Sequence, residues 1–261
     1  MTPTEWKKYI KETVIGKHEK GYQDDPDDKG NYLTKNNETV GLIGTKFGIS
    51  ANVLQEHTRH EITADDMKNL TMEKAVDIYM KDYVYGPKIN QLPNNLQKNV
   101  FDMAVNSGAK KAIIVLQEAI KDKAAKAGHN IKDEEFSVDG RWGKNTSSFL
   151  KMFPVSSNDY TDARIKKYES MVEADPIKEK YLTGWKNRAE SYRDSEQDQD
   201  KVNKVYEDRK SFEDARQEQE ASQIPMLRPE ENPEPPQEHQ IPYTMSNAMA
   251  KEVAKKQLKG K

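Results

Sequence analysis

Apolar residues recur at helical spacing in one segment of this chain after another. No run alternates apolar and polar residues with period two over more than a few positions. The segments end at glycine or proline, as at Gly86-Pro87 and at Gly108. This pattern predicts a mainly α fold. The helices are expected at residues 2–19, 50–61, 70–85, 92–107, 109–126, 145–152, 160–174 and 176–192.

The first of these helices carries the start signals of a capping box. Thr2 can cap the helix, Pro3 suits its first position and Glu5 completes the box. The helix is expected to end near Glu19. A carboxylate at that end faces the negative pole of the helix dipole, which disfavours its charged form, and partial burial acts in the same direction. Both effects suit a general acid.

A loop rich in aspartate follows Glu19 directly. Residues 20–50 contain many glycines and little periodicity, so we expect them to be irregular. Glycoside hydrolysis needs an acid and a second carboxylate, and Asp28 can face Glu19 across a cleft. The alternative interpretation stays open, in which Glu19 is a surface residue and the aspartates form turns.

The spacing of possible metal ligands argues against a metal site. A calcium loop that starts at Asp25 would place Asn36 where a bidentate glutamate is required. His57 and His60 share a helical face but form no zinc-protease motif, and the chain has no cysteine. We therefore expect no metal, no cofactor and no disulfide.

The composition limits the partners. The net charge is −2, so no global basic field favours nucleic acid. No run approaches 18 apolar residues, and the N-terminus lacks an apolar signal core. The chain is therefore expected to have neither a transmembrane segment nor a signal peptide, and delivery to a substrate outside the cytoplasm would need another route.

The composition changes near residue 190. Residues 193–223 are mostly charged and predict an acidic helix or linker, and residues 224–243 form a proline-rich linker. Residues 244–261 are basic, with Met245, Met249 and Val253 near one face of a predicted terminal helix.

Several motifs resemble one known family. Residues 19–22 followed by residues 25–30 are similar to the signature of glycoside hydrolase family 108, the phage and bacterial N-acetylmuramidases. The similarity continues in the same order through residues 44–50 and 101–108. Further on, residues 138–146 and 184–188 resemble the peptidoglycan-binding module that is fused to these enzymes.

The resemblance implies a domain organisation and a set of site residues. It implies a lysozyme-like helical catalytic region at residues 1–108 and a small helical peptidoglycan-binding module with closing helices at residues 109–192. Glu19 becomes the catalytic acid. Its implied partners are Asp28 and Thr45, and the candidate contacts to substrate are Tyr22 and Asn106.

The chain departs from the family pattern in two places. Lys20 replaces a glycine, and residues 31–40 look inserted. Because of the insertion, Thr34 competes with Thr45 for the third site position. Asp25 is a lesser rival to Asp28.

The expected function is that of an N-acetylmuramidase, a lysozyme that cleaves the β-1,4 bond between N-acetylmuramic acid and N-acetylglucosamine in peptidoglycan. The long tail further suggests a phage lysozyme that docks onto other virion or tail proteins through Ser246–Lys261. It would be located in the virion, or in the host cytoplasm before release to the cell wall. The alternative is a non-catalytic wall-binding or structural virion protein that keeps the fold.

Overall fold

The computed structural model describes residues 1–16, 21–36 and 38–194. These residues are mainly helical, as predicted. The α-helices are α1 (Pro3–Tyr9), α3 (Ala51–Glu56), α4 (Ala64–Lys68), α5 (Met72–Tyr79), α6 (Asn94–Ser107), α7 (Ala109–Lys126), α8 (Lys144–Met152), α9 (Ser157–Ala174) and α10 (Glu179–Glu190). The strands are β1 (Tyr22–Gln23), β2 (Tyr32–Lys35), β3 (Glu38–Leu42) and β4 (Thr45–Lys46).

Wider and tighter helical turns extend some of these helices. A π-helix follows α1 at Ile10–Ile15, and a second one follows α5 at Met80–Tyr85. Short 3-10 helices lie at Lys29–Asn31, Ile89–Gln91 and Pro176–Lys178.

The predicted capping box at the start of α1 is confirmed. The Thr2 side chain accepts a hydrogen bond from the Glu5 backbone N–H, and the Glu5 carboxylate accepts one from the Thr2 N–H at 2.7 Å. Trp6 and Ile10 are buried against the core. The expected end of this helix, including Glu19 and Lys20, lies outside the described residues.

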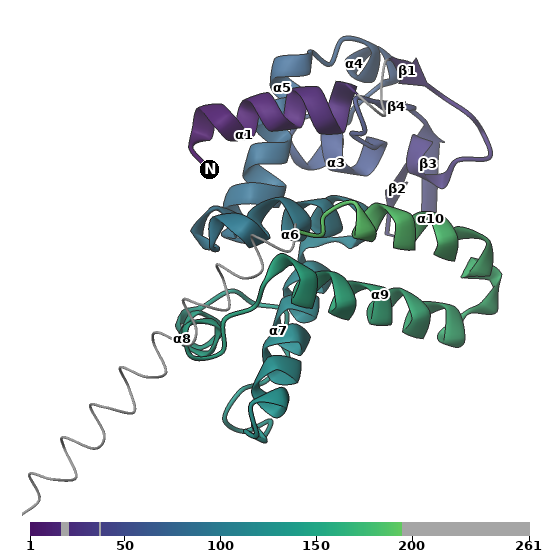
Figure 1. The fold of residues 1–261 in the computed structure, drawn as a ribbon. Coiled ribbons are helices and arrows are strands. Elements are labelled where there is room, and N and C mark those ends of the chain that lie inside the picture. The colour runs from purple at the N-terminus through teal and green to yellow at the C-terminus, as the bar shows by residue number, and fades with distance from the viewer. Residues whose placement is uncertain (17–20, 37, 195–261) are drawn as a thin grey trace, which may run out of the picture. The chain divides into compact units, whose positions relative to one another are not determined.

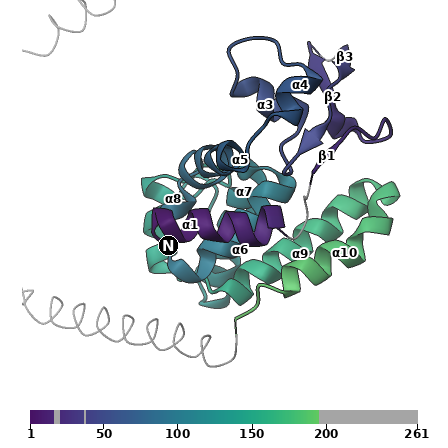
Figure 2. The ribbon, with the colours of Figure 1, turned by 90° about the horizontal axis from the view of Figure 1, so that it is seen from above.

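The prediction of an irregular segment at residues 20–50 is wrong. Strand β1 pairs with β4, and β2 pairs with β3, in two small antiparallel sheets. The strands are only two to five residues long, so alternation cannot reveal them in the sequence. Figure 2 shows strands β1, β2 and β3 grouped with α3 and α4 beside the other helices.

The segment that looked inserted, residues 31–40, contributes β2 and the start of β3. Strands β2 and β3 pair as a hairpin, and Asn36 follows the end of β2. Asn36 takes a positive φ of 51°, a conformation that asparagine tolerates better than most residues. The segment therefore belongs to the antiparallel pair of β2 and β3, and its being an insertion stays a prediction.

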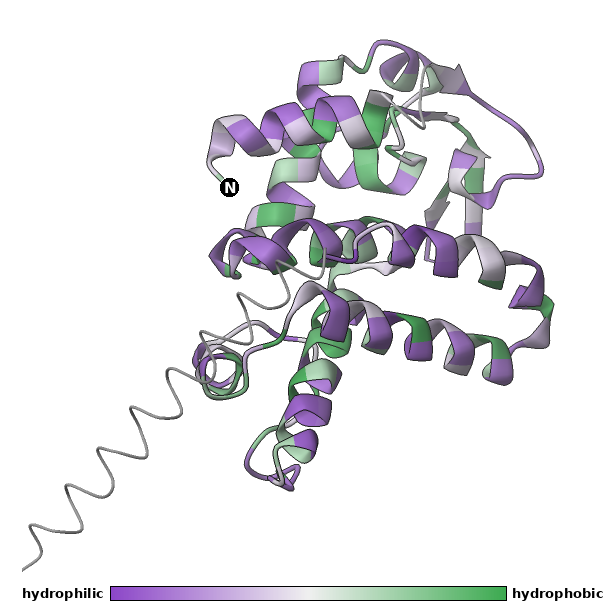
Figure 3. Cartoon of the chain, in the orientation of Figure 1, coloured by the Kyte–Doolittle hydropathy of each residue, from purple (hydrophilic) through white to green (hydrophobic). Residues whose placement is uncertain are grey.

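The helical core is built around α6, α7 and α9. Helix α6 packs on α7 and α9, and α9 packs on α7 and α10 (Figure 1). The predicted stripe of Ile113, Leu116 and Ile120 on α7 is buried, which confirms it. Hydrophobic and hydrophilic residues follow one another along α9 (Figure 3), and its buried residues Tyr160, Arg164 and Tyr168 recur at helical spacing.

The described residues fall in one compact unit. The predicted boundary at residue 108 lies at the turn between α6 and α7, where Gly108 has a φ of +91°. The domain boundaries stay predictions, and those of the linkers and the terminal helix beyond residue 194 lie outside the described residues. Within the described part of the chain, no helix is long and apolar enough to cross a membrane.

Candidate active site

Glu19 lies outside the described residues, whereas the loop that follows it is described from Gly21 onward. Asp28 is exposed, and both of its carboxylate oxygens accept a hydrogen bond. The donor to Oδ1 is the Gly30 backbone N–H at 2.8 Å, and the donor to Oδ2 is Gln23 Nε2 at 3.0 Å. The side chain is thus held in one orientation at the surface of the loop.

Asn31 organises this loop, and the sequence analysis missed it. Its side chain is fully buried, and Nδ2 donates to Gln23 Oε1 at 2.8 Å and to the Asp25 carbonyl at 2.9 Å. Its own carbonyl accepts from the N–H groups of Ile43 and Gly44 at 2.8 and 2.9 Å. Asn31 therefore ties the aspartate loop to the turn before β4. No sequence pattern marks a single asparagine for such a role.

Thr45 lies on the same structure. It pairs with Gln23 across β1 and β4, and its hydroxyl donates to the Gly30 carbonyl at 3.5 Å. Its exposed fraction is 8%. Asp28 and Thr45 are therefore joined through the backbone of residues 23–30.

The two rival residues make different contacts. Thr34 is exposed on β2, where its backbone N–H and its hydroxyl both donate to Asn52 Oδ1 at 2.9 and 3.2 Å. Asp25 accepts a hydrogen bond from the Asp27 N–H at 2.9 Å, as a turn-forming aspartate does. Thr34 thus belongs to the packing of β2 on α3, whereas Asp25 shapes the loop.

Tyr22 lies beside the loop and is half-buried. Its hydroxyl donates to the Ile43 carbonyl at 3.1 Å, and the Lys68 ammonium lies 5.3 Å from the centre of its ring. Burial, and then the nearby charge of Asp24, raise the pKa of the phenol, so it stays neutral and can donate.

Asn106 comes from a different element, the last turn of α6. It is exposed, and its Nδ2 donates to the carbonyl of Asp102 at 2.7 Å. Its hydrogen bonds within the described residues do not reach the aspartate loop.

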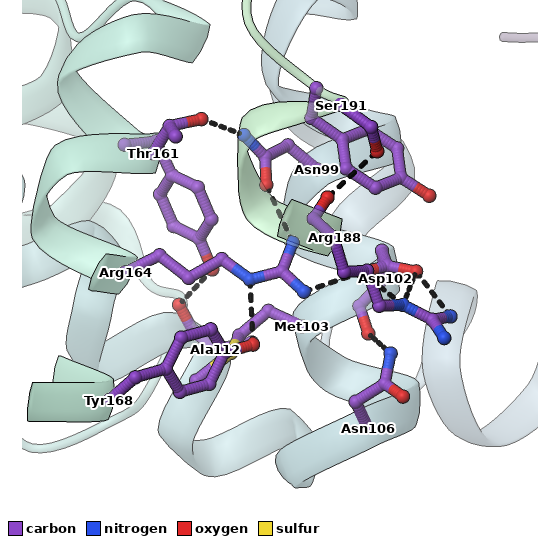
Figure 4. Close-up of polar contacts among 12 residues, drawn as sticks. Asn99, Asp102, Met103, Asn106, Ala112, Thr161, Arg164, Tyr168, Arg188 and Ser191 are labelled. Atoms are coloured by element: carbon purple, nitrogen blue, oxygen red, sulfur yellow. Dashed lines mark hydrogen bonds and ion pairs between the residues drawn. The ribbon is translucent and has the colours of Figure 1, made fainter. Parts of the chain in front are cut away.

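Next to Asn106 lies a buried ionic cluster (Figure 4). Asp102 accepts a hydrogen bond from Arg164 at 2.5 Å and two more from Arg188 at 2.7 and 2.9 Å. Arg164 is fully buried and also donates to Asn99 at 2.9 Å and to Tyr168 at 2.8 Å. The cluster joins α6, α9 and α10. The sequence does not reveal this cluster, because an arginine in a helix usually lies at the surface.

The two arginines set the electrostatics of this cluster. Burial raises the pKa of Asp102, but the hydrogen bonds and charges of Arg188 and Arg164 outweigh burial and hold the pKa below its ordinary value. The carboxylate therefore stays charged.

Two histidines contact aspartates, one with a buried side chain (His57) and one at the surface (His60). His57 Nε2 lies 2.6 Å from Asp82, and His60 Nε2 lies 3.2 Å from Asp66. Among residues 1–16, 21–36 and 38–194, no group of three or more His, Cys, Asp or Glu side chains is placed to hold a metal ion.

Residues 13–108, which include the aspartate loop and both candidate threonines, match the family model described as Glycosyl hydrolase 108. The chain carries a glycosyl hydrolase 108 domain. This domain ends at the Gly108 turn, so α6 lies inside it, whereas Arg164 and Arg188 of the ionic cluster lie beyond it.

One solved structure, titled "Structure of Brucella abortus SagA", is similar with a TM-score of 0.50 and 23% sequence identity. The similarity covers 74% of this chain and 99% of that chain. At this identity the likeness concerns the fold, and it extends well past the glycosyl hydrolase 108 domain. No curated protein matches this chain.

Proposed function

We propose that this protein is a peptidoglycan hydrolase, an N-acetylmuramidase of the lysozyme type that cleaves the β-1,4 bond between N-acetylmuramic acid and N-acetylglucosamine. The observation that carries the proposal is the glycosyl hydrolase 108 domain at residues 13–108, since this family indicates a glycoside hydrolase.

In this proposal, Glu19 protonates the leaving glycosidic oxygen. Asp28 stabilises the oxocarbenium-like transition state or orients the attacking water, and Thr45 helps to place that water or the sugar. The proposal is supported by the fixed and exposed carboxylate of Asp28 and by the contact of Thr45 with the same loop. Tyr22 and Asn106 are the proposed contacts to the glycan. The reaction needs no metal or cofactor.

Turbidity loss of purified cell walls, with mass spectrometry of the products, tests the assignment of the acid. A general acid contributes about 100- to 10,000-fold to rate, so Glu19→Gln is expected to lose at least about 100-fold. Asp28→Asn is compared with Asp25→Asn, since both aspartates shape the same loop. Equal losses in these two variants would mean that Asp28 acts only as a turn former.

The same assay separates the two threonines. Thr45→Val and Thr34→Val each remove a hydroxyl at nearly constant volume. We expect the larger loss from Thr45→Val, and a larger loss from Thr34→Val would transfer the third role to Thr34.

We also propose that the enzyme is associated with a phage virion or tail and docks there through Ser246–Lys261. The support comes from the sequence alone: a proline-rich linker that leads to a basic amphipathic segment. Limited proteolysis of assembled particles tests this proposal, because a docked segment is protected and an undocked one is cut at once.

A folded protein that binds walls but releases no products would favour the non-catalytic alternative.

A further inference from the structure

An open pocket of about 560 Å³ lies where the end of the second π-helix, the start of α7 and the turn before α8 meet. The turn consists of residues 139–142 and is the part of the chain that resembles a peptidoglycan-binding module. The pocket is lined from both sides of the Gly108 boundary, by Asp82 and Lys88 on one side and by Lys110, Arg141 and Trp142 on the other.

The walls of this pocket are fixed in place. Gly140 has a φ of +75°, and a Cβ there would lie 2.6 Å from Lys110 Cγ, so the turn sits directly on the first turn of α7. Gln117 holds the turn by donating to Asp139 Oδ1 at 2.9 Å and accepting from the Gly140 N–H at 2.8 Å. The Trp142 indole N–H donates to Gln91 at 3.2 Å, which orients the ring.

The two acidic residues of the pocket already have partners. Asp82 Oδ2 lies 2.6 Å from His57 Nε2. Asp139 Oδ1 accepts from Gln117 and from the Arg141 backbone N–H, each at 2.9 Å.

The three cationic residues of the pocket are not paired in this way. Lys88, Lys110 and Arg141 are exposed, and none forms an ion pair with a carboxylate of the described residues. Hydrogen bonds from Gln117 and from the Arg141 backbone N–H lower the pKa of Asp139, and the charge of Arg141 adds to this effect. No carboxylate oxygen of the described residues lies within ion-pair distance of the three side chains, so their donors are available to a ligand and the pocket is complementary to an anion.

The backbone conformation of Lys88 is a second indication that this side of the pocket has a binding role. Lys88 takes the left-handed conformation, with φ 60° and ψ 32°, directly after Gly86-Pro87. A lysine in that conformation is strained, and such strain concentrates at binding and catalytic sites.

We propose that this pocket binds the carboxylate groups of the peptide stems that peptidoglycan carries on muramic acid. In peptide-bearing strands the lactyl carboxyl group of muramic acid is tied up in the amide bond to the stem, so the stems supply the anionic groups that Lys88, Lys110 and Arg141 can recognise. Trp142 forms an apolar wall for the stem or for the neighbouring sugar. The pocket would make the enzyme prefer peptide-bearing strands to bare glycan. This inference rests on the proposed peptidoglycan substrate.

The test measures binding to purified glycan strands by the full chain with Glu19→Gln, in which turnover is stopped. One set of strands keeps its peptide stems. The other has been stripped with an amidase, which leaves one lactyl carboxylate on each muramic acid, so the comparison separates recognition of the stem carboxylates from attraction to any carboxylate of the strand. Lys88→Gln combined with Arg141→Gln is compared with the control pair Lys126→Gln and Lys132→Gln, two exposed lysines outside the pocket.

The pocket variant is expected to bind peptide-bearing strands about tenfold more weakly, because charge-assisted bonds are lost. The control pair is expected to change binding less than about twofold. The preference of the unsubstituted pocket for peptide-bearing strands should also weaken as salt is raised, and this check needs no pocket substitution.

Equal affinity for stripped and peptide-bearing strands would overturn the inference, and so would wild-type binding by the pocket variant or tighter binding to a phosphate-rich wall polymer. The outcome for the proposed activity is separate. Equal cleavage of both kinds of strand by the wild type would support the proposed activity and contradict the pocket inference. Selective binding without any cleavage would support the pocket inference and contradict the proposed activity.

Discussion

Asp102 is the residue on which the packing of three helices depends. It neutralises Arg164, which is fully buried, and it also holds Arg188 of α10. Asp102→Ala leaves a buried guanidinium unpaired, so we expect a loss of about 3–5 kcal/mol in the free energy of unfolding, measured with urea.

Asp122→Ala is the matched control for Asp102→Ala. Asp122 pairs with Lys166 at 2.7 Å on the surface, where the Lys166 side chain is largely exposed and that of Asp122 is about half exposed. Its loss is expected to cost less than about 1 kcal/mol. Equal effects of the two substitutions would contradict the description of the cluster.

The same carboxylates predict how stability depends on pH. Burial raises the pKa of Asp102 and of Asp159. In each case the hydrogen bonds and nearby cations lower the pKa by more than burial raises it, so both pKa values lie below their ordinary range. A lowered pKa in the folded state adds stability that is complete above the unfolded value of about 3.9 and is lost as pH falls through the folded value.

Thermal unfolding between about pH 6 and pH 2 measures this dependence. The wild type should lose stability steeply below about pH 4, and Asp159→Asn should flatten that slope. Parallel curves for the two proteins would show that Asp159 does not contribute. The sequence indicated Asp28 in the aspartate loop as a candidate site residue. It did not indicate the ion pair of Asp159 with Lys123, because these two residues lie far apart in the chain.

Among the elements, the small β1–β4 sheet controls the geometry of the aspartate loop. Gly44 has a φ of +93°, and a Cβ there would lie 2.4 Å from the Tyr22 ring and 2.8 Å from the Gln23 carbonyl. Gly44→Ala should therefore displace β1 and, with it, the donor that holds Asp28.

We expect Gly44→Ala to lower wall-degrading activity by about tenfold or more and stability by about 1–3 kcal/mol. Gly41→Ala is the control, because a Cβ at Gly41 meets nothing within 4 Å. If both variants keep wild-type activity in the turbidity assay, the β1–β4 sheet does not position the site.

Helices were more predictable than strands, for a physical reason. Periodicity over many residues and clear end signals located α6 and α7, and Thr2 located the start of α1. Helix α4 has five residues and the strands have two to five, which is too short for a period to show. Helix α9 starts at Ser157, earlier than predicted, because Ser156 and Asp159 form a capping box.

The site was predictable only in part. A family-like motif marked Glu19, Asp28 and Thr45 and predicted their roles. Asn31 and Gln23, which hold the loop, belong to no motif. Their importance comes from contacts across the chain that a linear pattern does not contain.

At the level of the whole molecule, α10 closes the fold within the described residues. Arg188 binds Asp102, the Tyr192 hydroxyl lies 3.1 Å from that of Tyr9, and the Tyr192 carbonyl accepts from Ser157 at 2.7 Å. A fragment that ends at residue 194 keeps all of these contacts.

We therefore expect the fragment 1–194 to retain wild-type activity on isolated walls and a thermal midpoint within about 2 °C of the full chain. A fragment that ends at residue 175 loses Arg188 and Tyr192 and should unfold well below that temperature. If the shorter fragment is equally stable, α10 does not close the fold.

The central claim is that this chain cleaves peptidoglycan with Glu19 as its acid. The most direct measurement is mass spectrometry of the products released from purified peptidoglycan by the wild type, Glu19→Gln and Asp28→Asn, with Asp25→Asn as the loop control. The account predicts fragments with muramic acid at the reducing end from the wild type and the control, few from Asp28→Asn and none from Glu19→Gln. Fragments released equally by Glu19→Gln, or none from a correctly folded wild type, would contradict it.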